Sequence, residues 1–185
     1  MKARVRVLSS KRIYDGRVVR LRLDRVVEPG GDEATREIVE HHGSVVVIPR
    51  LPNGNIVMVR QYRYATQGYL WELVAGSMDP GESVIRAARR ELQEETGYRA
   101  RSLNRLFSIY PSPGFLTEKM HLVEARDLTL VEASPEDDER IEVAEFSKIQ
   151  LDKLLRQNKI TDGKTLAGLL WDRWKVGVGN AKRNR

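Results

Sequence analysis

The feature that most constrains the fold of this sequence is a helix that cannot be stable without a covering surface. The segment from Ser83 to Thr96 has no helix breaker and is followed by Gly97, a residue type that commonly ends helices. At about 100° per residue, one arc of the helix collects the apolar side chains of Val84, Ile85, Ala88 and Leu92. The opposite side carries Arg86, Arg89 and Gln93. The sequence therefore predicts an amphipathic helix that packs one face on a larger apolar surface.

Glutamates near the end of this helix make it unfavourable unless cations neutralise them. Glu91 and Glu95 lie four residues apart at the edge of the apolar stripe, and Glu94 lies on the same flank. Like charges at this spacing repel by roughly 0.2–0.5 kcal/mol, and carboxylates in the last turn oppose the helix dipole by about 0.3–1 kcal/mol each. Arg90 can neutralise one of them, so the pattern favours a bound divalent cation. The alternative is an exposed acidic helix end.

Composition limits the side chains that could bind a metal ion and excludes some classes of protein. The chain has 185 residues, no cysteine and three histidines, which excludes disulfides and thiolate metal sites and leaves oxygen ligands for Mg²⁺ or Mn²⁺. A net charge of +6 favours anionic partners. The longest aliphatic run, residues 45–48, is too short to cross a membrane, and the charged N-terminus lacks the apolar segment of a secretory signal. A cytoplasmic protein without membrane contact is therefore expected.

Short apolar stretches between glycine and proline turns predict strands in most of the chain, with helices gathered towards its end. The predicted strands are 18–27, 36–41, 44–49, 55–60, 69–74, 101–110, 120–125 and 141–146. In the first of them, Val19, Leu21 and Leu23 lie on one face and Arg20, Arg22 and Asp24 on the other. The predicted helices are 83–96, 147–156 and 165–174. This order indicates an α+β protein or a mixed-sheet α/β sandwich.

The segment from Gly76 to Tyr98 resembles the Nudix box, G-x5-E-x7-R-E-U-x-E-E-x-G-U, in which U is a bulky apolar residue. The matching residues are Gly76, Glu82, Arg90, Glu91, Leu92, Glu94, Glu95, Gly97 and Tyr98. Only Tyr98 departs from the commoner aliphatic choice. The resemblance extends from about residue 14 to residue 171. It implies an α/β/α sandwich with a mixed sheet at 43–178, an N-terminal antiparallel strand region at 1–42 that forms a homodimer, and a basic tail at 179–185.

The resemblance also implies a chemistry, the Mg²⁺-dependent hydrolysis of nucleoside diphosphates linked to another group, with Mn²⁺ as a possible substitute. By position in the box, Glu91 and Glu95 would be the main metal ligands and catalytic residues, and Glu94 would be a third ligand. The backbone carbonyl of Ala75 would complete the set. Glu82 and Arg90 would hold the loop and the ligands in place.

Features outside the box resemble the ADP-ribose pyrophosphatase subgroup. Pro113 follows Gly97 by sixteen residues, Trp71 to Gly76 match the strand before the box, and Val59 to Arg63 match a third segment. The resemblance implies that Arg63 contacts the diphosphate and that the segment containing Ser112 and Gly114 contacts the substrate. It also places a catalytic glutamate in the acidic stretch 136–143. Glu139 fits that position best, and the alternatives are Glu142 and Asp137.

The sequence therefore predicts hydrolysis of ADP-ribose to AMP and ribose 5-phosphate. The alternatives are hydrolysis of another nucleoside diphosphate sugar, such as ADP-glucose or GDP-mannose, hydrolysis of a dinucleotide, and a sensor that binds ADP-ribose without cleaving it. Nucleic-acid binding is disfavoured, because aromatic residues make up 6% of the chain and no aromatic motif is interleaved with the basic residues.

Overall fold

The computed structural model of the chain describes residues 4–131 and 141–183, and side chains as far as residue 175. Contacts between residues divide the chain into two units. The first comprises Met1–Gly43 and Ile109–Lys119, and the second comprises Ser44–Ser108 and Met120–Arg185. Within the described ranges, no helix is both long enough and apolar enough to cross a membrane.

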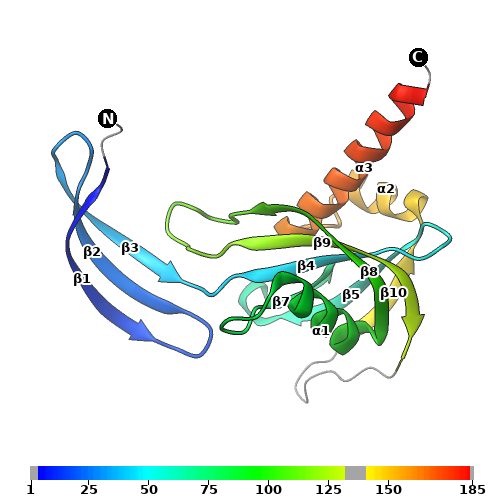
Figure 1. Cartoon of the computed structure of the whole chain (residues 1–185), viewed down its shortest axis with the longest axis horizontal. Coiled ribbons are helices and arrows are strands. Elements are labelled where there is room, and N and C mark those ends of the chain that lie inside the picture. The colour runs from blue at the N-terminus through cyan, green and yellow to red at the C-terminus, as the bar shows by residue number, and fades with distance from the viewer. Residues whose placement is uncertain (1–3, 132–140, 184–185) are drawn as a thin grey trace. The chain divides into compact units, whose positions relative to one another are not determined.

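The first unit contains a three-stranded antiparallel sheet with the order β1-β2-β3 (Figure 1). Its strands are β1 (Arg6–Asp15), β2 (Arg20–Val27) and β3 (Glu33–Glu40). Strand β1 was not predicted, because its basic and polar residues do not alternate with apolar ones and all ten of its side chains are exposed. In β2, the alternation of apolar and polar residues does not match which side chains are buried. Asp24 is buried and accepts a hydrogen bond from Arg22 Nε at 2.9 Å, whereas Leu21 and Leu23 are only partly buried.

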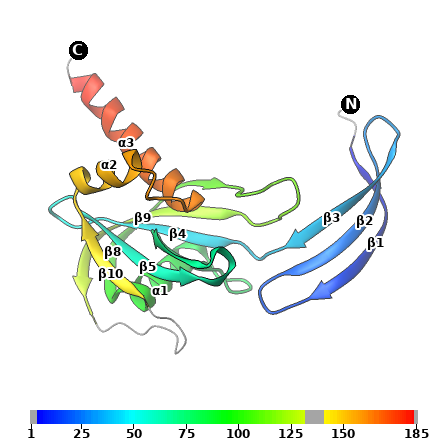
Figure 2. The ribbon, with the colours of Figure 1, turned by 180° about the vertical axis from the view of Figure 1, so that it is seen from behind.

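The second unit is an α/β/α sandwich, which confirms the predicted fold class (Figures 1 and 2). A four-stranded sheet has the order β7-β4-β9-β8, in which β4 and β9 are parallel, and a three-stranded antiparallel sheet has the order β10-β5-β6. Helix α1 lies on one side of the sheets, and α2 and α3 lie on the other. The strands are β4 (Ser44–Pro49), β5 (Ile56–Arg63), β6 (Gly68–Glu72), β7 (Val74–Ser77), β8 (Tyr98–Ile109), β9 (Met120–Leu130) and β10 (Glu142–Phe146). The helices are α1 (Val84–Thr96), α2 (Lys148–Arg156), α3 (Gly163–Arg183) and a short 3-10 turn, η1 (Tyr64–Thr66).

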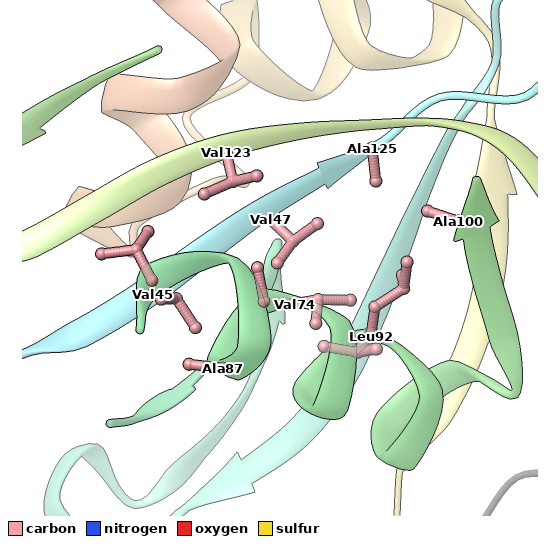
Figure 3. Close-up of a cluster of buried hydrophobic side chains, with 11 residues drawn as sticks. Val45, Val47, Val74, Ala87, Leu92, Ala100, Val123 and Ala125 are labelled. Carbon is pink, nitrogen blue, oxygen red and sulfur yellow. The ribbon is translucent and has the colours of Figure 1, made fainter. Parts of the chain in front are cut away.

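Helix α1 confirms the prediction made from its sequence. Ser83 caps its start by accepting a hydrogen bond from the backbone N–H of Arg86, and Gly97 ends it with a left-handed φ of 71°. The exposed side is basic, with Arg86 and Arg89 in solvent. The opposite side packs against β4, β7 and β9, and Leu92 lies among valines of these strands (Figure 3). Burial of this apolar face therefore fixes the direction in which the neighbouring glutamates point.

The predicted strand 69–74 is interrupted in the structure. Strand β6 ends at Glu72 and pairs with β5, whereas β7 begins at Val74 and pairs with β4 in the other sheet. Leu73 joins them, and its backbone N–H donates to the hydroxyl of Thr165 in α3 at 2.8 Å. The change of sheet at this residue brings Glu72 and the start of α3 together.

Candidate active site

The glutamates of α1 lie on the buried side of the helix, as the wheel predicted. Glu91 and Glu95 are only 8% and 7% exposed, and Glu94 is partly exposed. An ionised carboxylate loses much of its hydration in such a position, so it requires a partner of opposite charge. The structure provides one guanidinium that serves several of these groups.

That guanidinium belongs to Arg90, which joins three carboxylates and the end of β7. Its Nη1 donates to Glu91 Oε1 at 2.7 Å and to Glu94 Oε2 at 3.1 Å. Its Nη2 donates to Glu82 Oε2 and to the backbone carbonyl of Ser77, both at 3.0 Å. The structure thus brings together Glu82, Arg90, Glu91 and Glu94, four of the residues singled out in the sequence.

Glu82 ties the loop before α1 to the helix. Besides its contacts with Arg90, its Oε2 accepts a hydrogen bond from the backbone N–H of Asp79 at 3.1 Å, and its own backbone N–H donates to the carbonyl of Asp79 at 2.9 Å. The hydrogen bonds from Arg90 hold the pKa of Glu82 below its ordinary value, and the N–H of Asp79 acts in the same direction. Glu82 is therefore ionised at neutral pH and fixes the geometry of the loop.

Gly76 makes room for the carboxylate of Glu91. A Cβ atom at residue 76 would lie 2.1–2.2 Å from the three carboxyl atoms of Glu91, closer than atoms can approach. The Glu91 carboxylate therefore lies directly against the backbone of β7, beside Ala75. Any side chain larger than that of glycine would displace this carboxylate, so the fixed glycine has a physical reason.

The ligands predicted for a metal ion have the right chemistry, but their side chains, all within the described ranges, do not form a complete ion site. Three carboxylates and a backbone carbonyl are the hard oxygen donors that Mg²⁺ and Mn²⁺ prefer. In the part of the chain that the structure describes, however, no three histidine or acidic side chains lie close enough to hold an ion. Arg90 instead bridges Glu91 and Glu94. The room that Gly76 leaves for the Glu91 carboxylate beside the backbone of β7 fits a cation site in the chemistry of its oxygen donors.

Arg63, at the end of β5, makes a bidentate ion pair with Glu72. Its Nε donates to Glu72 Oε1 at 2.8 Å and its Nη2 to Oε2 at 2.9 Å. The hydrogen bond to Glu72 raises the pKa of Arg63, and the charge of Glu95 acts in the same direction, against the effect of burial. Arg63 therefore lies within electrostatic reach of Glu95, although 20 positions of sequence separate β5 from α1.

Two residues of this region were not identified from the sequence. Glu72 is the one charged residue in the apolar segment 69–74, and that was the available signal. Its second partner is Lys164, which contacts Oε2 from 92 residues further along the chain. No spacing rule could connect residues so far apart.

Of the remaining predicted residues, two belong to the first unit, two are outside the described residues and one begins β10. Ser112 and Gly114 belong to the first unit, where the Ser112 carbonyl accepts hydrogen bonds from the backbone N–H groups of Phe115 and Leu116 at 3.3 and 3.0 Å. Glu139 and Asp137 lie outside the described residues. Glu142 begins β10 and makes an exposed ion pair with Arg60 at 3.2 Å.

The first unit also contains a cavity of about 250 Å³. It is lined by Arg12, Gly16, Arg17, Val18, Arg20, Glu40, His41, His42 and Thr117. The arginines at 12 and 20 already pair with Asp15, and Arg12 also pairs with Glu40. This cavity contains none of the residues predicted to carry the chemistry.

Comparisons with known proteins find relatives along most of the chain. The family model described as the NUDIX domain matches residues 40–169. An ADP-ribose pyrophosphatase of Bacillus subtilis is 36% identical over 86% of this chain and 88% of its own length. A methanol dehydrogenase activator of Bacillus methanolicus is 37% identical over 87% and 88%. Among solved structures, a crystal structure of an ADP compounds hydrolase has a TM-score of 0.82 at 24% identity and covers 95% of this chain and 96% of its own, which shows a shared fold.

The pairing of Glu82 with Arg90 predicts a specific dependence of stability on pH. The ordinary pKa of this carboxyl group is 4.5 and its pKa in the folded protein is lower. The pairing therefore stabilises the fold fully above the ordinary pKa, and this contribution is lost as pH falls through the folded value. We expect the free energy of unfolding to decrease less in Glu82→Gln than in the wild type between about pH 7 and pH 3.

Urea denaturation with a chelator present would measure both proteins across that range. Glu33→Gln is the matched control, because Glu33 is an exposed glutamate that pairs with Arg25 in the first unit. It should keep the wild-type dependence on pH. Equal losses of stability in Glu82→Gln and the wild type would contradict the role given to this ion pair.

Proposed function

The chain belongs to the NUDIX family, and we propose that it hydrolyses the diphosphate of ADP-ribose to give AMP and ribose 5-phosphate, with Mg²⁺ or Mn²⁺ as cofactor. The observation that carries this proposal is the cluster around Arg90, in which the box residues Glu82, Glu91 and Glu94 share one guanidinium. The relative named as an ADP-ribose pyrophosphatase, similar along most of both chains, supports the choice of substrate.

Glu91, Glu94 and Glu95, with the backbone carbonyl of Ala75, are the residues that would hold the cofactor. Their support is the space that Gly76 leaves for the Glu91 carboxylate and the burial of Glu91 and Glu95 on one side of α1. When bound, a divalent ion neutralises charge on diphosphate oxygens and polarises a water molecule. Arg90 keeps Glu91 and Glu94 oriented, and Glu82 keeps Arg90 and the loop in place.

The other residues would bind the substrate and move the proton. Arg63 would contact the diphosphate, because its guanidinium lies within electrostatic reach of Glu95 and remains 38% exposed. The segment with Ser112 and Gly114 would contact the substrate. Glu139 would orient and deprotonate the attacking water, with Glu142 and Asp137 as the alternatives.

A panel of substrates tests whether the protein prefers ADP-ribose to other nucleoside diphosphate compounds. Purified protein with Mg²⁺ would be offered ADP-ribose, ADP-glucose, GDP-mannose and a dinucleotide, and the products would be detected through a phosphatase that acts on them alone. We expect kcat/KM for ADP-ribose to exceed the others by about tenfold or more, a difference of roughly 1.4 kcal/mol in transition-state binding. A flat profile would contradict the choice of ADP-ribose, and binding without turnover would favour the sensor.

The ligand role of Glu95 predicts that Glu95→Gln loses metal-dependent turnover while it keeps the fold. The amide replaces a charged oxygen donor with a neutral one, and metal catalysis supplies several kcal/mol of transition-state stabilisation. Turnover and circular dichroism of the variant would be compared with those of Gln93→Glu, a charge change on the opposite side of α1. Turnover above about a tenth of the wild-type rate would contradict the assignment.

We also propose that the protein is a homodimer that associates through the first unit. Strand β1 is an edge of its sheet, and exposed apolar side chains gather on it and beside it. These side chains are Val5, Val7, Leu8, Ile13, Tyr14 and Val18. Such a concentration of exposed apolar area is unusual for a monomer and suits a second copy of the chain.

Sedimentation analysis at micromolar concentration would measure this association. We expect the wild type to sediment as a dimer and Ile13→Lys to sediment largely as a monomer, because a charge in a desolvated interface is unfavourable. Ile149→Lys places the same charge on an exposed position of α2 and should remain a dimer. A monomeric wild type would contradict the proposal.

A further inference from the structure

Among the described residues of the second unit, the most deeply buried carboxylate belongs to Glu72, whose side chain is 1% exposed. It follows Trp71 and precedes Leu73 and Val74, both fully buried. Removing a carboxylate from water costs several kcal/mol unless paired charges compensate. Apolar side chains of similar volume in such positions are often neutral or stabilising. Stability of the fold alone therefore does not explain a buried carboxylate at this position.

Two cations from different parts of the chain meet this carboxylate. Arg63 reaches it from β5 with two parallel hydrogen bonds, at 2.8 and 2.9 Å. Lys164 reaches Oε2 from the first turn of α3 and also pairs with Asp162 at 3.0 Å. Burial would raise the pKa of Glu72, but these two cations lower it below its ordinary value, so the carboxylate is ionised at neutral pH.

The start of α3 is fixed relative to Glu72. Thr165 is fully buried, and its hydroxyl accepts a hydrogen bond from the backbone N–H of Leu73 at 2.8 Å. Its own backbone N–H donates to Asp162 Oδ2 at 2.9 Å. The lysine between these residues is 12% exposed and has little freedom to move. Lys164 is therefore held by the backbone around it at a set position on the carboxylate.

The geometry determines which part of Arg63 stays available. A guanidinium has five N–H donors in one plane, and the pair with Glu72 uses one on Nε and one on Nη2. The two parallel bonds fix the plane, so the direction of the other donors is fixed as well. Arg63 is also 38% exposed and lies within electrostatic reach of Glu95. Its free donors are thus presented to an anion at a defined angle.

We propose that Glu72 and Lys164 are positioning residues that hold the Arg63 guanidinium in the orientation that binds the diphosphate of the substrate, an inference that rests on the proposed function. Lys164 shares the charge of Glu72, so that Arg63 can bind a second anion without leaving the buried carboxylate uncompensated. Without Lys164, Arg63 is the cation that the described part of the chain leaves on this carboxylate, and a diphosphate must compete with Glu72 for it.

Kinetics of Lys164→Met with ADP-ribose tests this role. The loss of an orienting contact weakens binding of ground state and transition state alike, so KM should rise by about tenfold while kcat stays within about threefold. Lys164→Arg keeps the cation and should recover most of the affinity. Lys159→Met removes an exposed lysine ahead of α3 and should behave as the wild type. A fall in kcat with unchanged KM would overturn the proposal.

A double-mutant cycle separates positioning from a merely structural role. If Lys164 acts through Arg63, Lys164→Met should raise KM by less than about twofold when it is added to Arg63→Ala. An added effect as large as in the wild-type background would overturn the proposal. Glu72→Gln should show the same dependence on Arg63, and thermal unfolding would establish that each variant folds. If Glu72→Gln does not fold, the Lys164 cycle decides alone.

The affinity for ADP, measured by titration calorimetry, gives a readout that does not require turnover. Lys164→Met should bind ADP about tenfold more weakly than the wild type, and the difference should vanish in the Arg63→Ala background. A wild type that cleaves no substrate would contradict the proposed function, yet the ADP affinities would still test the cluster. Equal ADP affinity in the wild type and Lys164→Met would overturn the positioning role.

Discussion

The site depends on the burial of carboxylates against a sheet, where they lose most of their hydration. The apolar face of α1 packs on β4, β7 and β9, and the same rotation of the helix turns Glu91 and Glu95 inward. Once these charges are buried, their neighbours must provide compensation. The guanidinium of Arg90, the open backbone at Gly76 and the loop fixed by Glu82 all follow from this requirement. The hydrophobic effect thus sets the geometry of the polar groups.

Two buried carboxylate sites of the second unit are each neutralised by an arginine. Arg90 serves three carboxylates on the side of α1, and Arg63 with Lys164 serves Glu72 between β6 and α3. In both places a planar guanidinium binds a buried carboxylate and keeps part of its surface exposed. Arrangements of this kind favour anionic ligands, because the arginine is already ordered and little entropy is lost when a phosphate binds. The two clusters together provide both signs of charge that a diphosphate and its cation require.

Local sequence patterns predicted the parts of the fold that local interactions decide. Helix α1, its end at Gly97 and the bounds of β4 follow from periodicity and breaker residues, and the structure confirms them. Strand β1 could not be predicted, because it has no buried face and pairing with β2 alone makes it a strand. The Glu72–Lys164 contact was equally out of reach, since it joins residues 92 positions apart through tertiary packing. Pattern reasoning found the charges around Arg90 and missed the tertiary contacts of Glu72 and Lys164.

Glu72 shows why a buried charge is kept where an apolar residue would fit. A leucine in its place would avoid the desolvation of the carboxylate, which is 1% exposed. It would also release Arg63 to the conformations of an ordinary exposed arginine, whose side-chain entropy opposes binding. The carboxylate therefore lowers the stability of the fold but keeps the Arg63 guanidinium ordered. Order in the guanidinium has a use where it binds an anion, and this connects Glu72 to the proposed substrate.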